Sequence, residues 1–66
     1  MIWDNPEPGV YEAFTTRTIN VGLEVYQPNA DDPDLYRWWA FSEGRVLGSG
    51  ECVGLEAAKA ACEAVI

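Results

Sequence analysis

The stretch LYRWWAFSEGRVLGSGECV, residues 35–53, contains the clearest indication of how this chain folds. Residues 35–42 and 46–53 have the length of strands, and the first of them is rich in the aromatic residues that strands favour. The segment SEGR between them contains Gly44, which adopts a positive φ without strain and so permits a tight turn. The stretch therefore predicts two antiparallel strands joined as a hairpin.

Another strand precedes this hairpin, and a helix follows it. Apolar residues alternate with other residues over 19–27, as in a half-buried strand, and Pro28 ends the run. After Gly54, an acceptable N-cap, residues 55–66 have apolar side chains at helical spacing. We therefore expect one α+β domain over residues 1–66, with a three-stranded antiparallel β-meander and a C-terminal α-helix packed on one face.

The N-terminal segment NPEPGVYEAFTTR, residues 5–17, has an ambiguous pattern. Val10, Ala13 and Phe14 lie at helical spacing, which suits a short helix. Val10, Glu12 and Phe14 also occupy every second position, so they would lie on one face of a strand. We expect an N-terminal arm or short helix here, with a strand as the alternative.

The aromatic strand, residues 35–42, has bulky side chains on both faces, because alternate residues of a strand point to opposite sides. An alanine-rich helix can approach the face with Tyr36 and Trp38 closely, so we expect the helix to cover that face. Trp39 and Phe41 then point away from the helix.

Two arrangements are open for this second face. The N-terminal arm, with Trp3, Val10 and Phe14, can fold over it and complete a core that is thin in so short a chain. Alternatively, part of the face stays open, and Trp39 is then an interface aromatic for a partner or a second copy.

The chain is strongly acidic, with 11 Asp and Glu residues against 4 Lys and Arg and a net charge of −7. The acids are concentrated in residues 1–34, which contain seven of them and a single basic residue, Arg17. Because binding to phosphates needs clustered Lys and Arg, this composition argues against nucleic acid and for a basic partner. The alternative is a solvated surface that keeps a small protein soluble. The candidate partner-binding acids are Glu12, Glu24, Asp31, Asp32, Asp34 and Glu43.

The residues of common catalytic and metal sites are missing or poorly spaced. There is no His, so Ser-His-Asp and Cys-His arrangements cannot form. In NADDPD, residues 29–34, Pro33 and Leu35 break the spacing of an EF-hand loop, which leaves calcium only as a weak surface ligand. Cys52 and Cys62 have no His between them to form a zinc site. We expect no catalytic residues, no metal site, no cofactor and no enzyme activity.

The sequence also favours a cytoplasmic protein. The opening MIWDNPEPG lacks the basic and apolar regions of a secretion signal, and no apolar run reaches the length of a membrane span. Two cysteines fit a reducing compartment, in which they serve as small buried hydrophobes rather than as a disulfide.

The whole chain, from MIWDNPEPG through PNADDPDLYRWWAF to GLEAAKAACEAVI, resembles the small phage-encoded anti-CRISPR proteins, and in particular the type I-C inhibitors. The resemblance implies a stoichiometric inhibitor in the host cell cytoplasm. Its partner would be the basic DNA-binding surface of a type I Cascade subunit, where it would block target DNA or recognition of the protospacer-adjacent motif. The candidate acids would then act as a DNA mimic, in place of phosphates.

A second function remains open. The protein can be a small non-enzymatic phage or bacterial adaptor that homodimerises, or docks a host protein, through its aromatic sheet face. We favour a monomer, with a homodimer as the alternative.

Overall fold

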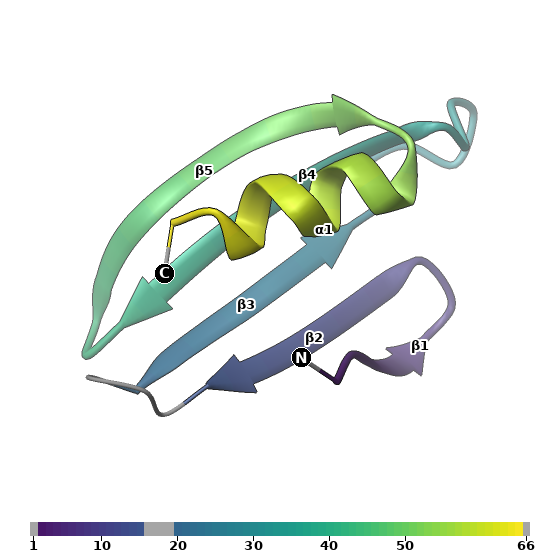
Figure 1. Cartoon of the computed structure of the whole chain (residues 1–66). Coiled ribbons are helices and arrows are strands. Elements are labelled where there is room, and N and C mark those ends of the chain that lie inside the picture. The colour runs from purple at the N-terminus through teal and green to yellow at the C-terminus, as the bar shows by residue number, and fades with distance from the viewer. Residues whose placement is uncertain (1, 16–19, 66) are drawn as a thin grey trace.

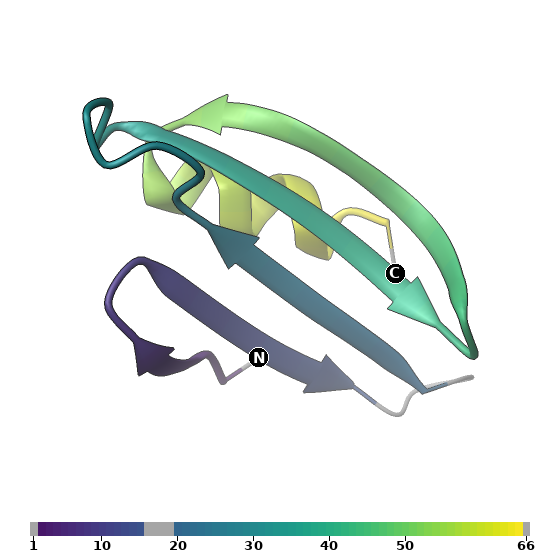
Figure 2. The ribbon, with the colours of Figure 1, turned by 180° about the vertical axis from the view of Figure 1, so that it is seen from behind.

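The structure is a computed structural model that describes residues 2–15 and 20–65, and within these ranges five antiparallel strands form one sheet in the order β1-β2-β3-β4-β5 (Figure 1). The strands are β1 (Asp4–Glu7), β2 (Val10–Thr15), β3 (Val21–Tyr26), β4 (Leu35–Ser42) and β5 (Arg45–Val53), and α1 (Leu55–Glu63) follows. The helix lies on one face of the sheet, and Figure 2 shows the molecule from the opposite side. The α+β class and the C-terminal helix are confirmed, whereas the sheet has two more strands than expected.

The two additional strands come from the N-terminal segment, for which the expectation of an arm or short helix was wrong. β1 and β2 form a hairpin in which Glu7 is opposite Val10. Pro8 and Gly9 make the turn, and Gly9 has a φ of 80°, which suits the third position of a type II turn after proline. The pairing of β2 with β3 provides hydrogen-bond partners for backbone N–H and C=O groups of both strands. It therefore favours the strand, which the alternating pattern predicts, over the helix.

The hairpin between β4 and β5 has the expected tight turn. Ser42 is opposite Arg45, and the two residues between them have positive φ, 51° at Glu43 and 79° at Gly44. Positive φ at both central residues is the requirement of a type I′ turn, whose twist matches that of the flanking strands.

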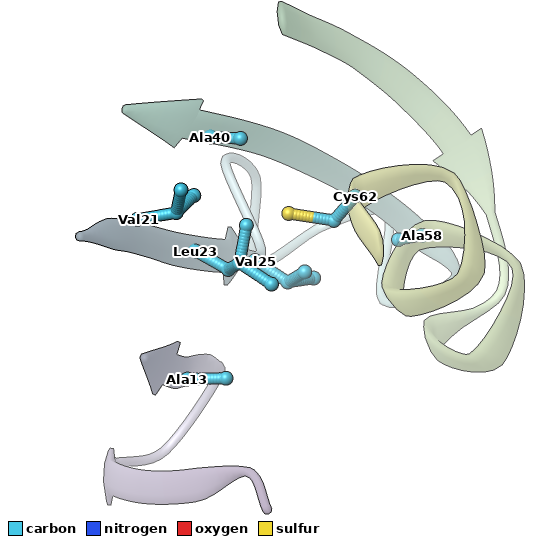
Figure 3. Packing of buried hydrophobic residues seen from close by; sticks show 7 residues of the cluster. All are labelled: Ala13, Val21, Leu23, Val25, Ala40, Ala58 and Cys62. Carbon is cyan, nitrogen blue, oxygen red and sulfur yellow. The ribbon is translucent and has the colours of Figure 1, made fainter. Parts of the chain in front are cut away.

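The core lies between α1 and the sheet and is built from small and branched side chains. The helix contacts β3, β4 and β5. Ala58 and Cys62 are fully buried, and Figure 3 shows the Cys62 sulfur directed from the helix toward the sheet. Small side chains on the buried side of the helix let it approach closely, as expected. The buried apolar residues are Ala13, Val21, Leu23, Val25, Ala40, Ala58 and Cys62.

Two glycines of β5 make room for Trp38 on the helix side of the sheet. Gly50 and Gly48 are the cross-strand neighbours of Trp38 and Ala40. A Cβ at Gly50 would lie 2.9 Å from Trp38 Nε1, and a Cβ at Gly48 would lie 3.5 Å from Trp38 Cη2. The indole therefore lies across β5 at positions where no side chain competes with it.

Trp3 lies on the helix side of the sheet as well. Its Nε1 donates a hydrogen bond to Glu63 Oε2 at 3.0 Å, and Lys59 Nζ lies 5.7 Å and 5.2 Å from the ring centroids of Trp3 and Tyr11. Phe14 points to the other side and is 63% exposed. The N-terminal segment thus extends the sheet instead of folding over its second face, and the arrangement in which it covers Trp39 was wrong.

No helix within residues 2–15 and 20–65 is long and apolar enough to cross a membrane.

Candidate protein-binding face

The sheet face opposite α1, which we call the helix-free face, is open to solvent at most positions (Figure 2). Because directly opposite residues of antiparallel strands share a face, the pairing of the strands identifies its members. Trp39 and Phe41 belong to it, as the sequence predicted. The face is formed by Asp4, Glu7, Val10, Glu12, Phe14, Gly22, Glu24, Tyr26, Arg37, Trp39, Phe41, Val46, Ser49 and Glu51.

The centre of the helix-free face is aromatic. The Trp39 and Phe41 rings are 4.8 Å apart between centroids and tilted by 39°. Phe41 lies over its cross-strand neighbour Gly22, where a Cβ would come within 2.5 Å of Phe41 Cζ. Phe14 is the neighbour of Gly22 on the other side. The rings therefore lie close to the sheet and stay partly accessible, with Phe41 36% exposed.

Three carboxylates cross the same face in neighbouring strands. Asp4 of β1 is directly opposite Glu12 of β2, and Glu12 is directly opposite Glu24 of β3. We call these three residues the carboxylate row. Directly opposite residues have Cα atoms about 4.5–5.5 Å apart, so like charges at such positions repel one another and destabilise the sheet.

The carboxylate row meets the aromatic centre at Glu24. Its Oε1 accepts a hydrogen bond of 2.7 Å from Nε1 of Trp39, the residue opposite it on β4. This bond satisfies the polar group of a half-buried indole and orients the ring over the sheet.

Two ion pairs form in the described part of the chain, and both lie outside the carboxylate row. Arg37 Nε is 2.9 Å from Glu51 Oε2, and this hydrogen bond, with a further one to Tyr26, raises the pKa of Arg37 above its usual range. Lys59 pairs with Glu56 along the helix, with 3.6 Å between Nζ and Oε2. Neither of these ion pairs, the two found in the described part of the chain, includes a member of the row.

The structure brings together only some of the acids that the sequence singled out. Glu12 and Glu24 are cross-strand neighbours, and Asp4, which was not predicted, joins them. Glu43 lies in the turn after β4, whereas the three aspartates precede β4. The eight residues of β4, about 27 Å at 3.4 Å per residue, separate them. The aspartates are Asp31, Asp32 and Asp34.

The aspartate loop between β3 and β4 is held by its own hydrogen bonds. Asn29 Oδ1 accepts from the Asp31 amide at 2.9 Å, and the Asn29 carbonyl accepts from the Asp32 amide at 3.1 Å. Gln27 Nε2 donates to the Pro33 carbonyl at 2.7 Å, and the Asp34 carbonyl accepts from the amide of Gly54. The backbone is thus ordered while the carboxylates remain exposed. Across residues 2–15 and 20–65, no cluster of three or more potential metal ligands is present.

The two cysteines are free thiols. Burial raises the pKa of Cys62 to about 11, so this thiol stays protonated at neutral pH, and its Sγ donates to the Trp39 carbonyl at 3.4 Å. Cys62 is therefore the small buried hydrophobe that the sequence predicted, whereas Cys52 on β5 is only half-buried.

Shallow hollows flank the aromatic centre. One of about 450 Å³ lies between Trp39 and the first hairpin and is lined by Glu7, Val10, Glu24, Tyr26 and Trp39. Another, of about 270 Å³, follows the carboxylate row and is lined by Asp4, Glu12, Ala13, Phe14, Gly22, Leu23, Glu24 and Phe41. Carboxylates beside exposed rings suit contact with cationic groups of another molecule.

Comparison of the chain with protein-family models, with curated proteins and with solved structures gives no match.

Proposed function

We propose that this protein is a non-enzymatic inhibitor that binds the basic DNA-binding surface of another protein and presents carboxylates in place of phosphates. The observation that carries this proposal is the carboxylate row of Asp4, Glu12 and Glu24 on an open sheet face. Directly opposite like charges disfavour the sheet. Local conflicts of this kind are expected at functional sites, where binding rather than folding sets the residue choice.

The proposed partner is a subunit of a type I Cascade surveillance complex, as the resemblance to type I-C anti-CRISPR proteins implies. The proposed effect is to block target DNA or recognition of the protospacer-adjacent motif, in the cytoplasm of the host cell. Support comes from the net charge of −7, which speeds encounter with a positive surface. The exposed aspartate loop adds a second cluster of charge at one end of β4.

The test is a binding and DNA-competition assay with a purified type I-C surveillance complex. One variant, Asp4→Asn with Glu12→Gln, neutralises two positions of the row, and a second, Asp31→Asn with Asp32→Asn and Asp34→Asn, neutralises the loop. Glu56→Gln with Glu63→Gln, both on the helix and away from the helix-free face, removes two charges like the row variant and is its matched control.

We expect the row variant to lose at least tenfold in affinity and to stop competing with DNA, while the control keeps both. The row variant should fold at least as stably as the parent, because its repulsion is relieved. Unchanged binding and inhibition in both the row variant and the loop variant would refute the proposal.

A second candidate is an adaptor or homodimer that uses the aromatic centre, and the exposure of Phe14 favours it. Two copies joined through this face would bring two carboxylate rows together, and salt would have to screen their repulsion. Light scattering at low and high salt separates the candidates. A dimer that Phe14→Ser dissociates favours the second, whereas a monomer at all salt concentrations favours the first.

A further inference from the structure

The larger hollow beside the carboxylate row has the composition of a site for a cationic side chain. Its aromatic lining consists of Trp39 and Tyr26, Val10 supplies an apolar contact, and Glu7 and Glu24 add two carboxylates. We call it the Trp39 hollow. Its volume of about 450 Å³ is at the scale of pockets that accept small molecules, so it is ample for one long side chain.

The Trp39 ring is positioned before any partner arrives. Nε1 is hydrogen-bonded to Glu24 Oε1 at 2.7 Å, and Phe41 lies 4.8 Å away between ring centroids. Among the described residues, the Glu24 carboxylate makes a single hydrogen bond, the one with Trp39 Nε1. Oε2 of Glu24 can therefore accept a hydrogen bond from another donor. The site thus offers a held aromatic ring next to an available carboxylate oxygen.

The described cations of the chain do not line the Trp39 hollow. Arg37 is opposite Tyr26 in the sheet, but its Nε is bonded to Glu51, and it lines a neighbouring hollow instead. Lys59 lies on the helix side of the sheet, between Trp3 and Tyr11. No described cation therefore lines the hollow beside its two carboxylates, and Arg37 reaches only Tyr26 at its edge.

We propose that the Trp39 hollow binds one arginine side chain of the basic protein partner, an inference that rests on the proposed function. A guanidinium is planar, stacks on aromatic faces and donates paired hydrogen bonds to carboxylates. Trp39 and Tyr26 would meet its plane, and Glu7 and Glu24 would accept from its edge. Lysine has a compact, strongly hydrated charge and uses the aromatic rings less well.

The test uses the free protein and a small probe. N-acetyl-arginine amide is titrated into the labelled protein, and the indole N–H resonance of Trp39 is followed by NMR, with N-acetyl-citrulline amide as the uncharged probe of similar shape. We expect a saturable shift of the Trp39 resonance at millimolar arginine and at least tenfold weaker binding of citrulline.

Two matched variants locate the binding. Glu7 is exposed on an edge strand, so Glu7→Gln should fold normally and weaken arginine binding at least threefold. Glu43→Gln removes the same charge from the far end of β4, outside the hollow, and should change nothing.

Four outcomes overturn the inference. Equal binding of citrulline means that the hollow does not select a cation, and equal weakening by Glu43→Gln means that only net charge matters. A dimer detected by light scattering at the same concentration, with Trp39 protected, means that a second copy occupies the face. If arginine fails to bind while DNA competition persists, this inference is wrong and the proposed function stands. If arginine binds but the protein does not inhibit the complex, this inference stands and the proposed function is wrong.

Discussion

Trp39 Nε1 and Glu24 Oε1 are joined by a hydrogen bond of 2.7 Å between directly opposite residues of β4 and β3. The bond connects the aromatic centre of the helix-free face to the carboxylate row, because Glu24 is also directly opposite Glu12. One acidic residue therefore both orients a half-buried indole of the open face and contributes to a concentration of negative charge.

Replacement of Glu24 by Gln should stabilise the protein. Gln keeps an oxygen that accepts from Trp39 Nε1 but removes the charge opposite Glu12, which is worth about 0.2–1 kcal/mol by the usual size of cross-strand pairs. Urea denaturation followed by tryptophan fluorescence measures the change. Glu24→Leu removes the acceptor as well and should be less stable than Glu24→Gln; the opposite order would contradict this account.

Gly50→Ala should destabilise the protein by about 1–3 kcal/mol, the usual cost of overpacking. A Cβ there would lie 2.9 Å from Trp38 Nε1, and Trp38 is packed against the core on the helix side of the sheet. Gly22→Ala is the informative comparison, because its Cβ would meet Phe41, a ring on the open face that can move into solvent. We expect a smaller loss of stability in Gly22→Ala, measured by thermal unfolding, and an equal loss would show that Phe41 is as constrained as Trp38.

Stability should fall between about pH 9 and about pH 11 because of Cys62. Burial raises the pKa of this thiol from 9.0 to about 11, so in that interval the unfolded chain loses a proton that the folded protein keeps. The stabilising contribution is complete below pH 9 and disappears as the pH rises through 11. Urea midpoints across this range check the effect, and Cys62→Ala should remove this fall in stability.

Trp3→Phe should loosen the N-terminal hairpin. The substitution keeps a ring near Lys59 but removes the 3.0 Å hydrogen bond from Nε1 to Glu63, worth about 0.5–1.5 kcal/mol. Amide hydrogen exchange of β1 should accelerate, while β3 at the centre of the sheet should change less. Equal acceleration in both strands would indicate that the hairpin unfolds only with the whole domain.

The local sequence pattern was sufficient to predict β4, the Glu43-Gly44 turn and the helix. In each of these the periodicity, the turn residue and the cap agree, so the local preferences and the final structure coincide. The placement of Tyr36 and Trp38 toward the helix, and of Trp39 away from it, follows from the alternation of a strand alone.

The N-terminal segment could not be resolved in this way, because Val10 and Phe14 fit both the helical and the alternating pattern. Pairing with β3 decided between them. The same applies to Asp4, which lies eight residues from Glu12 in the chain and shows no periodic relation to it.

Residue order thus specified the antiparallel core, the covering helix and the excess of negative charge. The carboxylate row and the open aromatic face depend on which residues of separate strands stand opposite each other, and that register is set only when the strands pair and α1 covers one side of the sheet. A shift of one residue in that pairing would send Glu12 and Glu24 to opposite faces, because side chains alternate along every strand.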